Sequence, residues 1–147
     1  QGKHPVRLVI DRHLKLPGTL QLFDAKVPTV IFNEQQHTIS DSNRILSAGN
    51  WFYQVGKGVS MVEQVVKALY QLRIQSVLVE GGAQLLQSFI NEGFWDEARV
   101  ITNEALTIPG GIAAPRLTNT IKTGEERFFS DSISYYIPSS CRSGIKE

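Results

Sequence analysis

The sequence SVLVEGGAQLLQSFINEG, residues 76–93, changes its hydrophobic period halfway along. Its first part holds a short apolar run, from Val77 to Val79, that predicts a strand over residues 74–79 covered on both faces. From Ala83 onward the apolar residues recur at helical spacing, and Gly93 follows as a helix stop. The stretch therefore predicts a buried strand that passes through a glycine turn into an amphipathic helix.

The turn between the two elements holds Glu80, Gly81 and Gly82. A strand that enters a helix through two glycines presents backbone N–H groups at the positive end of the helix dipole, an arrangement that binds phosphate. A second interpretation stays open, because many such turns carry two glycines only to reverse the chain tightly. The G-x-G-x-x-G fingerprint of dinucleotide-binding Rossmann folds is absent.

Composition excludes several classes of protein. The chain has 147 residues, 41% hydrophobic and 20% charged, as expected for one globular domain. A net charge of +1 gives no reason to expect nucleic acid as a partner, and no apolar run is long enough for a membrane span or signal peptide. Cys141 is the single cysteine, and we interpret it as incidental and not as a catalytic thiol. The three histidines are scattered without ligand spacing, so no metal site is predicted. The cytoplasm is the expected location.

The remaining chain predicts an α/β order. A helix is expected over residues 60–73, with Ser60 and Glu63 as a capping box and an apolar face of Val62, Val65, Val66, Leu69 and Leu72. Further strands are expected over residues 6–11, 29–33, 51–55 and 98–102, and residues 128–129 and 134–137 form two closing strands or one bulged strand.

This order predicts parallel strands with an antiparallel C-terminal edge. Ligands in such sheets bind beyond the carboxyl ends of the strands. The polar residues at those ends are expected to gather there; they are Asp11-Arg12, Asn33-Glu34 and Glu80-Gly81-Gly82.

Three stretches carry a resemblance to a known family. They are VLVEGGAQLLQSFINEGFWDEARVI with the later Gly-Gly loop and APRL, HPVRLVIDRHLKLP, and LFDAKVPTVIF. In this order they resemble the reductase domain of the bifunctional riboflavin-biosynthesis deaminase/reductase, from about Pro5 to about Pro138. The resemblance implies a dihydrofolate-reductase-like fold, a homodimer, and NADPH-dependent reduction of the ribosyl group of 5-amino-6-(5-phosphoribosylamino)uracil to a ribitylamino group.

The resemblance also implies site residues. Glu80 would contact the substrate, and the loop and helix start under the NADPH pyrophosphate would comprise Gly82, Ala83, Gln84, Leu85 and Leu86. Arg12 falls at a cofactor contact, where it would pair with the 2′-phosphate of NADPH; a solvent-facing arginine is the alternative. No general acid is predicted. Glu80 is equally suited to capping the following helix.

The departures from the family concern completeness. Family members have an earlier strand and helix with substrate-phosphate contacts, and a zinc-binding deaminase domain, which nothing upstream of Pro5 supplies. We therefore expect residues 1–147 to be the C-terminal part of a single reductase domain that lacks turnover alone. Two other functions stay open: a different reductase of the same fold that uses NADPH, and a non-catalytic module that binds a nucleotide or a partner.

Overall fold

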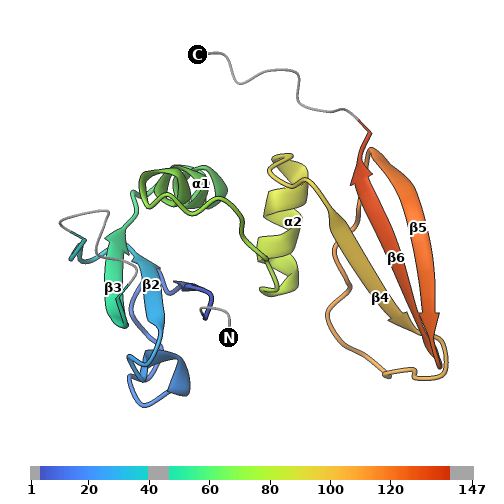
Figure 1. Ribbon diagram of the computed structural model, residues 1–147, viewed down its shortest axis with the longest axis horizontal. Coiled ribbons are helices and arrows are strands. Elements are labelled where there is room, and N and C mark those ends of the chain that lie inside the picture. The colour runs from blue at the N-terminus through green and yellow to red at the C-terminus, as the bar shows by residue number, and fades with distance from the viewer. Residues whose placement is uncertain (1–3, 40–46, 140–147) are drawn as a thin grey trace. The chain divides into compact units, whose positions relative to one another are not determined.

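A computed structural model of the chain describes residues 4–39 and 47–139. Cys141 and part of the predicted loop over residues 34–49 lie outside these ranges. The chain forms two compact units, Gln1–Val77 and Leu78–Glu147 (Figure 1). Among the described residues, no helix has the length and apolar character to cross a membrane.

The first unit contains a parallel three-stranded sheet in the order β1-β2-β3. Its strands are β1 (Arg7–Ile10), β2 (Pro28–Asn33) and β3 (Gly49–Gln54), which confirms the three strands predicted for this region. The loop between β1 and β2 includes a short 3-10 helix, η1 (Gln21–Phe23). In register, Ile10 lies beside Phe32, and Phe32 beside Tyr53.

β2 is the centre of the core, because residues 29–33 are all buried. On one face of the sheet, the ring of Phe32 lies 5.5 Å from that of Tyr53, whose hydroxyl donates to Gln71 Oε1 of the neighbouring helix over 2.7 Å. On the other face, the hydroxyl of Thr29 donates to the carbonyl of Leu22 over 3.2 Å. A helix and a loop therefore cover the two faces, as the apolar pattern of β2 requires.

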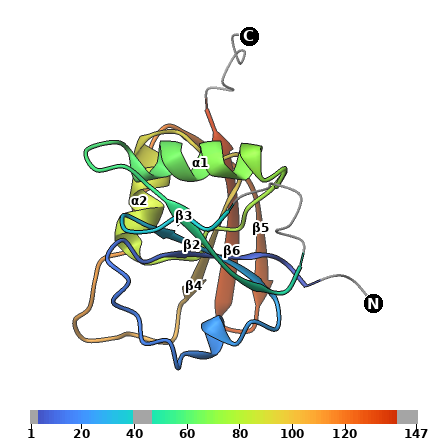
Figure 2. The ribbon, with the colours of Figure 1, turned by 90° about the vertical axis from the view of Figure 1, so that its left-hand side faces the viewer.

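The helix α1 (Met61–Gln71) lies next to β2 and β3 in both views (Figures 1 and 2). Ser60 Oγ accepts the backbone N–H of Glu63 over 3.1 Å, so the predicted N-cap is confirmed. Four of the five apolar residues predicted for its inner face are buried, and Val66 is half-buried. The apolar period therefore identified the correct face of this helix.

The C-terminus of α1 ends in a left-handed residue that is not glycine. Arg73 has φ 55°, and its N–H donates to the carbonyl of Tyr70 over 3.1 Å. The N–H of Ile74 donates to the carbonyl of Leu69 over 2.9 Å. This pair of bonds is the Schellman motif, which usually has glycine at the left-handed position.

The second unit contains α2 (Ala83–Asn91) and an antiparallel sheet in the order β4-β6-β5. Its strands are β4 (Ala98–Asn103), β5 (Thr120–Phe128) and β6 (Asp131–Pro138). The helix and β4 are confirmed, and the C-terminal strands pair antiparallel as predicted. The parallel pairing expected for β4 is wrong, because β4 pairs antiparallel with β6 in a sheet of its own. β5 starts well before the predicted closing strand. A bulge lies between Lys122 and Gly124.

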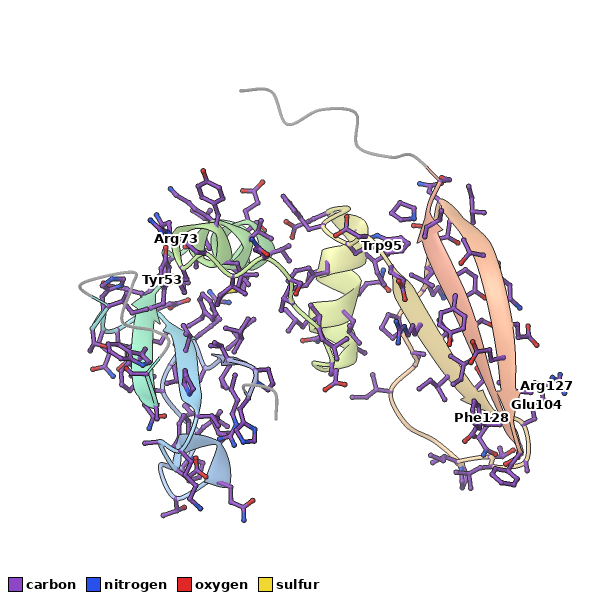
Figure 3. All side chains as sticks on the ribbon, in the orientation of Figure 1. Tyr53, Arg73, Trp95, Glu104, Arg127 and Phe128 are labelled. Atoms are coloured by element: carbon purple, nitrogen blue, oxygen red, sulfur yellow. The ribbon has the colours of Figure 1, made fainter. Side chains whose placement is uncertain are left out.

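The turn of the β5–β6 hairpin places Phe129 at φ 53° with its side chain in solvent. Next to it, Arg127 Nη2 lies 3.0 Å from Glu104 Oε1, and Figure 3 shows both side chains near Phe128. At the other end of this unit, Gly93 ends α2 with φ 67°, and the N–H of Phe94 donates to the carbonyl of Phe89 over 3.0 Å. The predicted glycine stop is confirmed.

The strand predicted over residues 74–79 is wrong, because these residues have no regular secondary structure. Val77 and Leu78 are 40% and 81% exposed, although their pattern predicted burial on both faces. A strand needs a neighbour that accepts and donates its ladder hydrogen bonds. Within the described residues, no strand pairs with this segment, so its preference for extended backbone does not produce a strand.

Candidate functional site

The carboxyl ends of β1 and β2 bring together a charged cluster of Arg12, His13 and Glu34. Arg12 Nε donates to Glu34 Oε1 over 2.7 Å, and its Nη2 lies 2.6 Å from the same oxygen. His13 Nδ1 lies 3.8 Å from Glu34 Oε2. The side chain of Glu34 is only 4% exposed, whereas that of Arg12 is 53% exposed. The cluster thus presents a guanidinium to solvent and keeps its partner carboxylate inside.

Backbone contacts fix the two loops that carry this cluster. The N–H of Glu34 donates to the carbonyl of Arg12 over 2.9 Å, and Gln35 Nε2 donates to the carbonyl of His13 over 2.9 Å. Gln54 Nε2 donates to the carbonyl of Glu34 over 3.2 Å. The positions of the charged groups are therefore set by the ends of all three strands.

Two neighbouring polar residues of the predicted group have structural roles here. The carboxylate of Asp11, 8% exposed, accepts the backbone N–H groups of Lys15 and Leu16, each over 2.9 Å. Asn33 is fully buried, and its Oδ1 accepts the N–H groups of Gln35 and Gln36 over 2.9 and 2.7 Å. These side chains shape the loops, and Arg12 is left as the exposed donor.

The glycine turn lies in the second unit. Gly82 is the N-cap of α2, and its carbonyl accepts the N–H groups of Leu85 and Leu86 over 3.0 and 3.2 Å. No side chain caps the helix. The first N–H groups of an α-helix have no acceptor within it. Because Glu80, Gly81 and Gly82 are all exposed, this end of α2 is open to an anion.

Steric tests distinguish the two glycines. A Cβ at Gly81 would lie 2.7 Å from Leu85 Cδ2, whereas a Cβ at Gly82 would meet nothing within 4 Å. Gly82 also has φ −56°, which any residue adopts. Neither backbone nor packing therefore requires glycine at residue 82, and the space beside it suits a phosphate group.

The other predicted cofactor residues lie in the first turn of α2. Ala83, Leu85 and Leu86 are half-buried, and Gln84 is exposed. Glu80 is exposed next to the helix start, which suits either substrate contact or the helix dipole. The gathering of residues 80–82 with Arg12 stays a prediction.

Each unit also has an open pocket. One, of about 350 Å³, lies between the loop after β1 and the sheet face that carries Ile31 and Phe52. The other, of about 380 Å³, lies on the antiparallel sheet, where the guanidinium of Arg99 is 5.5 Å from the ring centre of Tyr135. Among the described residues, no group of three His, Cys, Asp or Glu side chains is arranged to hold a metal ion.

Comparison with solved structures defines the fold class. A diaminohydroxyphosphoribosylaminopyrimidine deaminase/5-amino-6-(5-phosphoribosylamino)uracil reductase of Thermotoga maritima is similar over 94% of this chain and 39% of its own, with a TM-score of 0.67 and 20% identity. A pyrimidine reductase-like protein of Corynebacterium diphtheriae is similar over 90% of this chain and 60% of its own, with a TM-score of 0.68 and 15% identity. The fold is the mixed α/β fold of these reductase domains.

Comparison of sequences defines the family. The model of the RibD C-terminal domain matches residues 1–126, so the chain belongs to that family. The riboflavin biosynthesis protein RibD of Bacillus amyloliquefaciens is 32% identical over 116 residues, which are 78% of this chain and 31% of that protein. A 2,5-diamino-6-ribosylamino-4(3H)-pyrimidinone 5′-phosphate reductase of Aquifex aeolicus is 28% identical over 80% of this chain and 52% of its own length. The chain thus spans about a third to a half of these relatives.

Proposed function

We propose that this chain is the C-terminal part of an enzyme that uses NADPH to reduce the ribosyl group of 5-amino-6-(5-phosphoribosylamino)uracil in riboflavin biosynthesis. Family membership and the reductases among its relatives support the reaction class. The observation that carries the proposal is the uncapped start of α2, with exposed glycines at residues 81 and 82.

The start of α2 fits a diphosphate by its own chemistry. The N–H groups of its first turn, at Ala83 and Gln84, lie at the positive end of the helix dipole, and no side chain caps them. The side chains of Leu85 and Leu86 are half-buried, so these residues contribute by anchoring the helix. Gly82 leaves open space where another residue would place a Cβ.

Arg12 fits a second phosphate, that of the adenosine 2′ position in NADPH. Its guanidinium is half-exposed and fixed by Glu34, and arginine binds phosphate through paired N–H groups. NADH lacks this phosphate, so Arg12 would discriminate between the two cofactors.

Glu80 would orient the substrate by accepting its hydrogen bonds, while the bound nicotinamide supplies the hydride. The exposed carboxylate lies next to the start of α2, where a negative charge interacts favourably with the helix dipole. The proposal extends to the whole protein as a homodimer with a deaminase domain, which would carry the zinc.

The test is binding of NADPH and NADH to the protein and to two glycine variants. Gly82→Ala puts a methyl group into open space and removes a preferred N-cap residue, so we expect helix stability to fall by under about 1 kcal/mol. We expect the NADPH dissociation constant to rise about tenfold, because the methyl group occupies the phosphate position. The measurement is titration by fluorescence with a melting curve for each variant.

Gly81→Ala is the matched control for packing, because its Cβ would press on Leu85 and lower the melting temperature. The proposal fails if wild-type protein binds neither cofactor, a result that favours a module without cofactor. It also fails if Gly82→Ala binds NADPH as tightly as wild type.

A further inference from the structure

Glu34 is the buried member of the cluster at the carboxyl ends of β1 and β2. Its side chain is 4% exposed, and both contacts to Arg12 converge on one oxygen, Oε1, at 2.7 Å from Nε and 2.6 Å from Nη2. A buried carboxylate of this kind needs a fixed charged partner. Arg12 therefore has one edge of its guanidinium held against the protein.

The geometry leaves the other end of the guanidinium available. Nε and Nη2 face Glu34, and within the described residues Nη1 of Arg12 has no hydrogen-bond partner. The Arg12 side chain is 53% exposed, and it lies at the carboxyl ends of β1 and β2, the edge at which ligands of parallel sheets bind. A phosphate and Glu34 can therefore contact Arg12 at the same time.

We propose that Glu34 is a positioning residue for cofactor selectivity: it holds Arg12 so that the free N–H groups meet the 2′-phosphate of NADPH. This inference rests on the proposed function. An arginine in water loses much rotamer freedom when it binds an anion, and a guanidinium that is already ordered loses less. Glu34 thus strengthens NADPH binding through Arg12, although its negative charge reduces the attraction of the pair for phosphate.

The opposite role, in which Glu34 competes with phosphate for Arg12, makes the opposite prediction. A competitor would have to be displaced, and its removal would tighten NADPH binding. The two roles are separated by two shape-matched variants. Glu34→Gln keeps an oxygen acceptor for Arg12, whereas Glu34→Met fills the same buried space without one.

The experiment measures dissociation constants of NADPH and NADH for the protein and its variants at fixed ionic strength. We expect Glu34→Met to raise the NADPH value about fivefold and to leave NADH unchanged, and Glu34→Gln to stay within roughly twofold of wild type. In an Arg12→Ala background, Glu34→Met should add no further change, because Glu34 acts through Arg12. If Glu34→Met does not fold, Glu34→Ala is a second variant that removes the acceptor for Arg12.

Glu97→Gln is the matched control, because Glu97 Oε1 also accepts from an arginine Nε, that of Arg99 at 2.8 Å, in the other unit. Glu97→Gln should leave the dissociation constants of NADPH and NADH unchanged. If Arg12→Ala abolishes the NADPH preference but Glu34→Met does not, or if Glu34→Met tightens NADPH binding, the positioning role is wrong and the proposed function stands. If Arg12→Ala changes nothing, Arg12 does not read the phosphate and the positioning role falls with it.

Discussion

The two sheets of this chain differ in how well their apolar residues are covered. In the parallel sheet, Val30, Ile31 and Phe32 are completely buried between a helix and a loop. In the antiparallel sheet, the four central residues of β4 are exposed, and Ile101 reaches 68%. Both strands have the same length and a similar apolar content. The burial of a strand therefore depends on the elements that pack against it, and these cannot be read from the sequence of the strand itself.

The largest expected loss of stability comes from truncating a buried residue of the parallel sheet. Phe32→Ala removes a fully buried ring from β2, and we expect it to lower the free energy of unfolding of the first unit by about 3–5 kcal/mol. Ile101→Ala, its counterpart on the exposed strand, should cost under about 1 kcal/mol. Urea denaturation of both variants measures the two values. Equal losses would mean that β4 is covered in solution.

A smaller effect concerns the two helix ends, which use the same motif with different residues. Gly93 and Arg73 both have left-handed φ, 67° and 55°, after α2 and α1. We expect Gly93→Ala to destabilise by about 1 kcal/mol and Arg73→Gly to stabilise by about 0.5–1 kcal/mol, because only glycine takes this conformation without strain. Thermal melts of the two variants give the signs. Two shifts in the same direction would contradict this account.

The smallest effect depends on pH and belongs to the first unit alone. Burial raises the pKa of Tyr53, whose hydroxyl donates to Gln71 of α1. A raised pKa means that the unfolded chain loses this proton first, so stability is full below about pH 10 and falls as pH rises above it. Tyr53→Phe should flatten the alkaline part of the stability curve. An unchanged slope would assign the effect to another group.

Most of the elements could be predicted from sequence because their signals are local. The apolar period and the Ser60 cap placed α1, and Gly82 and Gly93 bounded α2. Local signals could not decide whether residues 74–79 form a strand, because a strand forms only when a neighbouring strand pairs with it. The same limit applies to the length of β5, whose pairing with β6 extends over residues with little apolar pattern.

The site could be predicted in part. Arg12 was named as a cofactor contact from the family resemblance, and the glycine turn from its place between an apolar run and a helix; both are exposed. The expected meeting of Arg12 and Glu34 at the strand ends is confirmed. The burial of the Glu34 side chain was missed, because it depends on packing between loops that lie 22 residues apart in the sequence.

The exposed segment before the glycine turn has a practical consequence. The division between the two units falls between Val77 and Leu78, in backbone that has no regular structure. Such a segment is accessible to proteases, and the exposed side chain of Leu78 would direct a protease of chymotrypsin type to the bond between Leu78 and Val79. Brief digestion followed by mass spectrometry would show whether cleavage occurs here, and circular dichroism of each product would show whether it keeps its own fold.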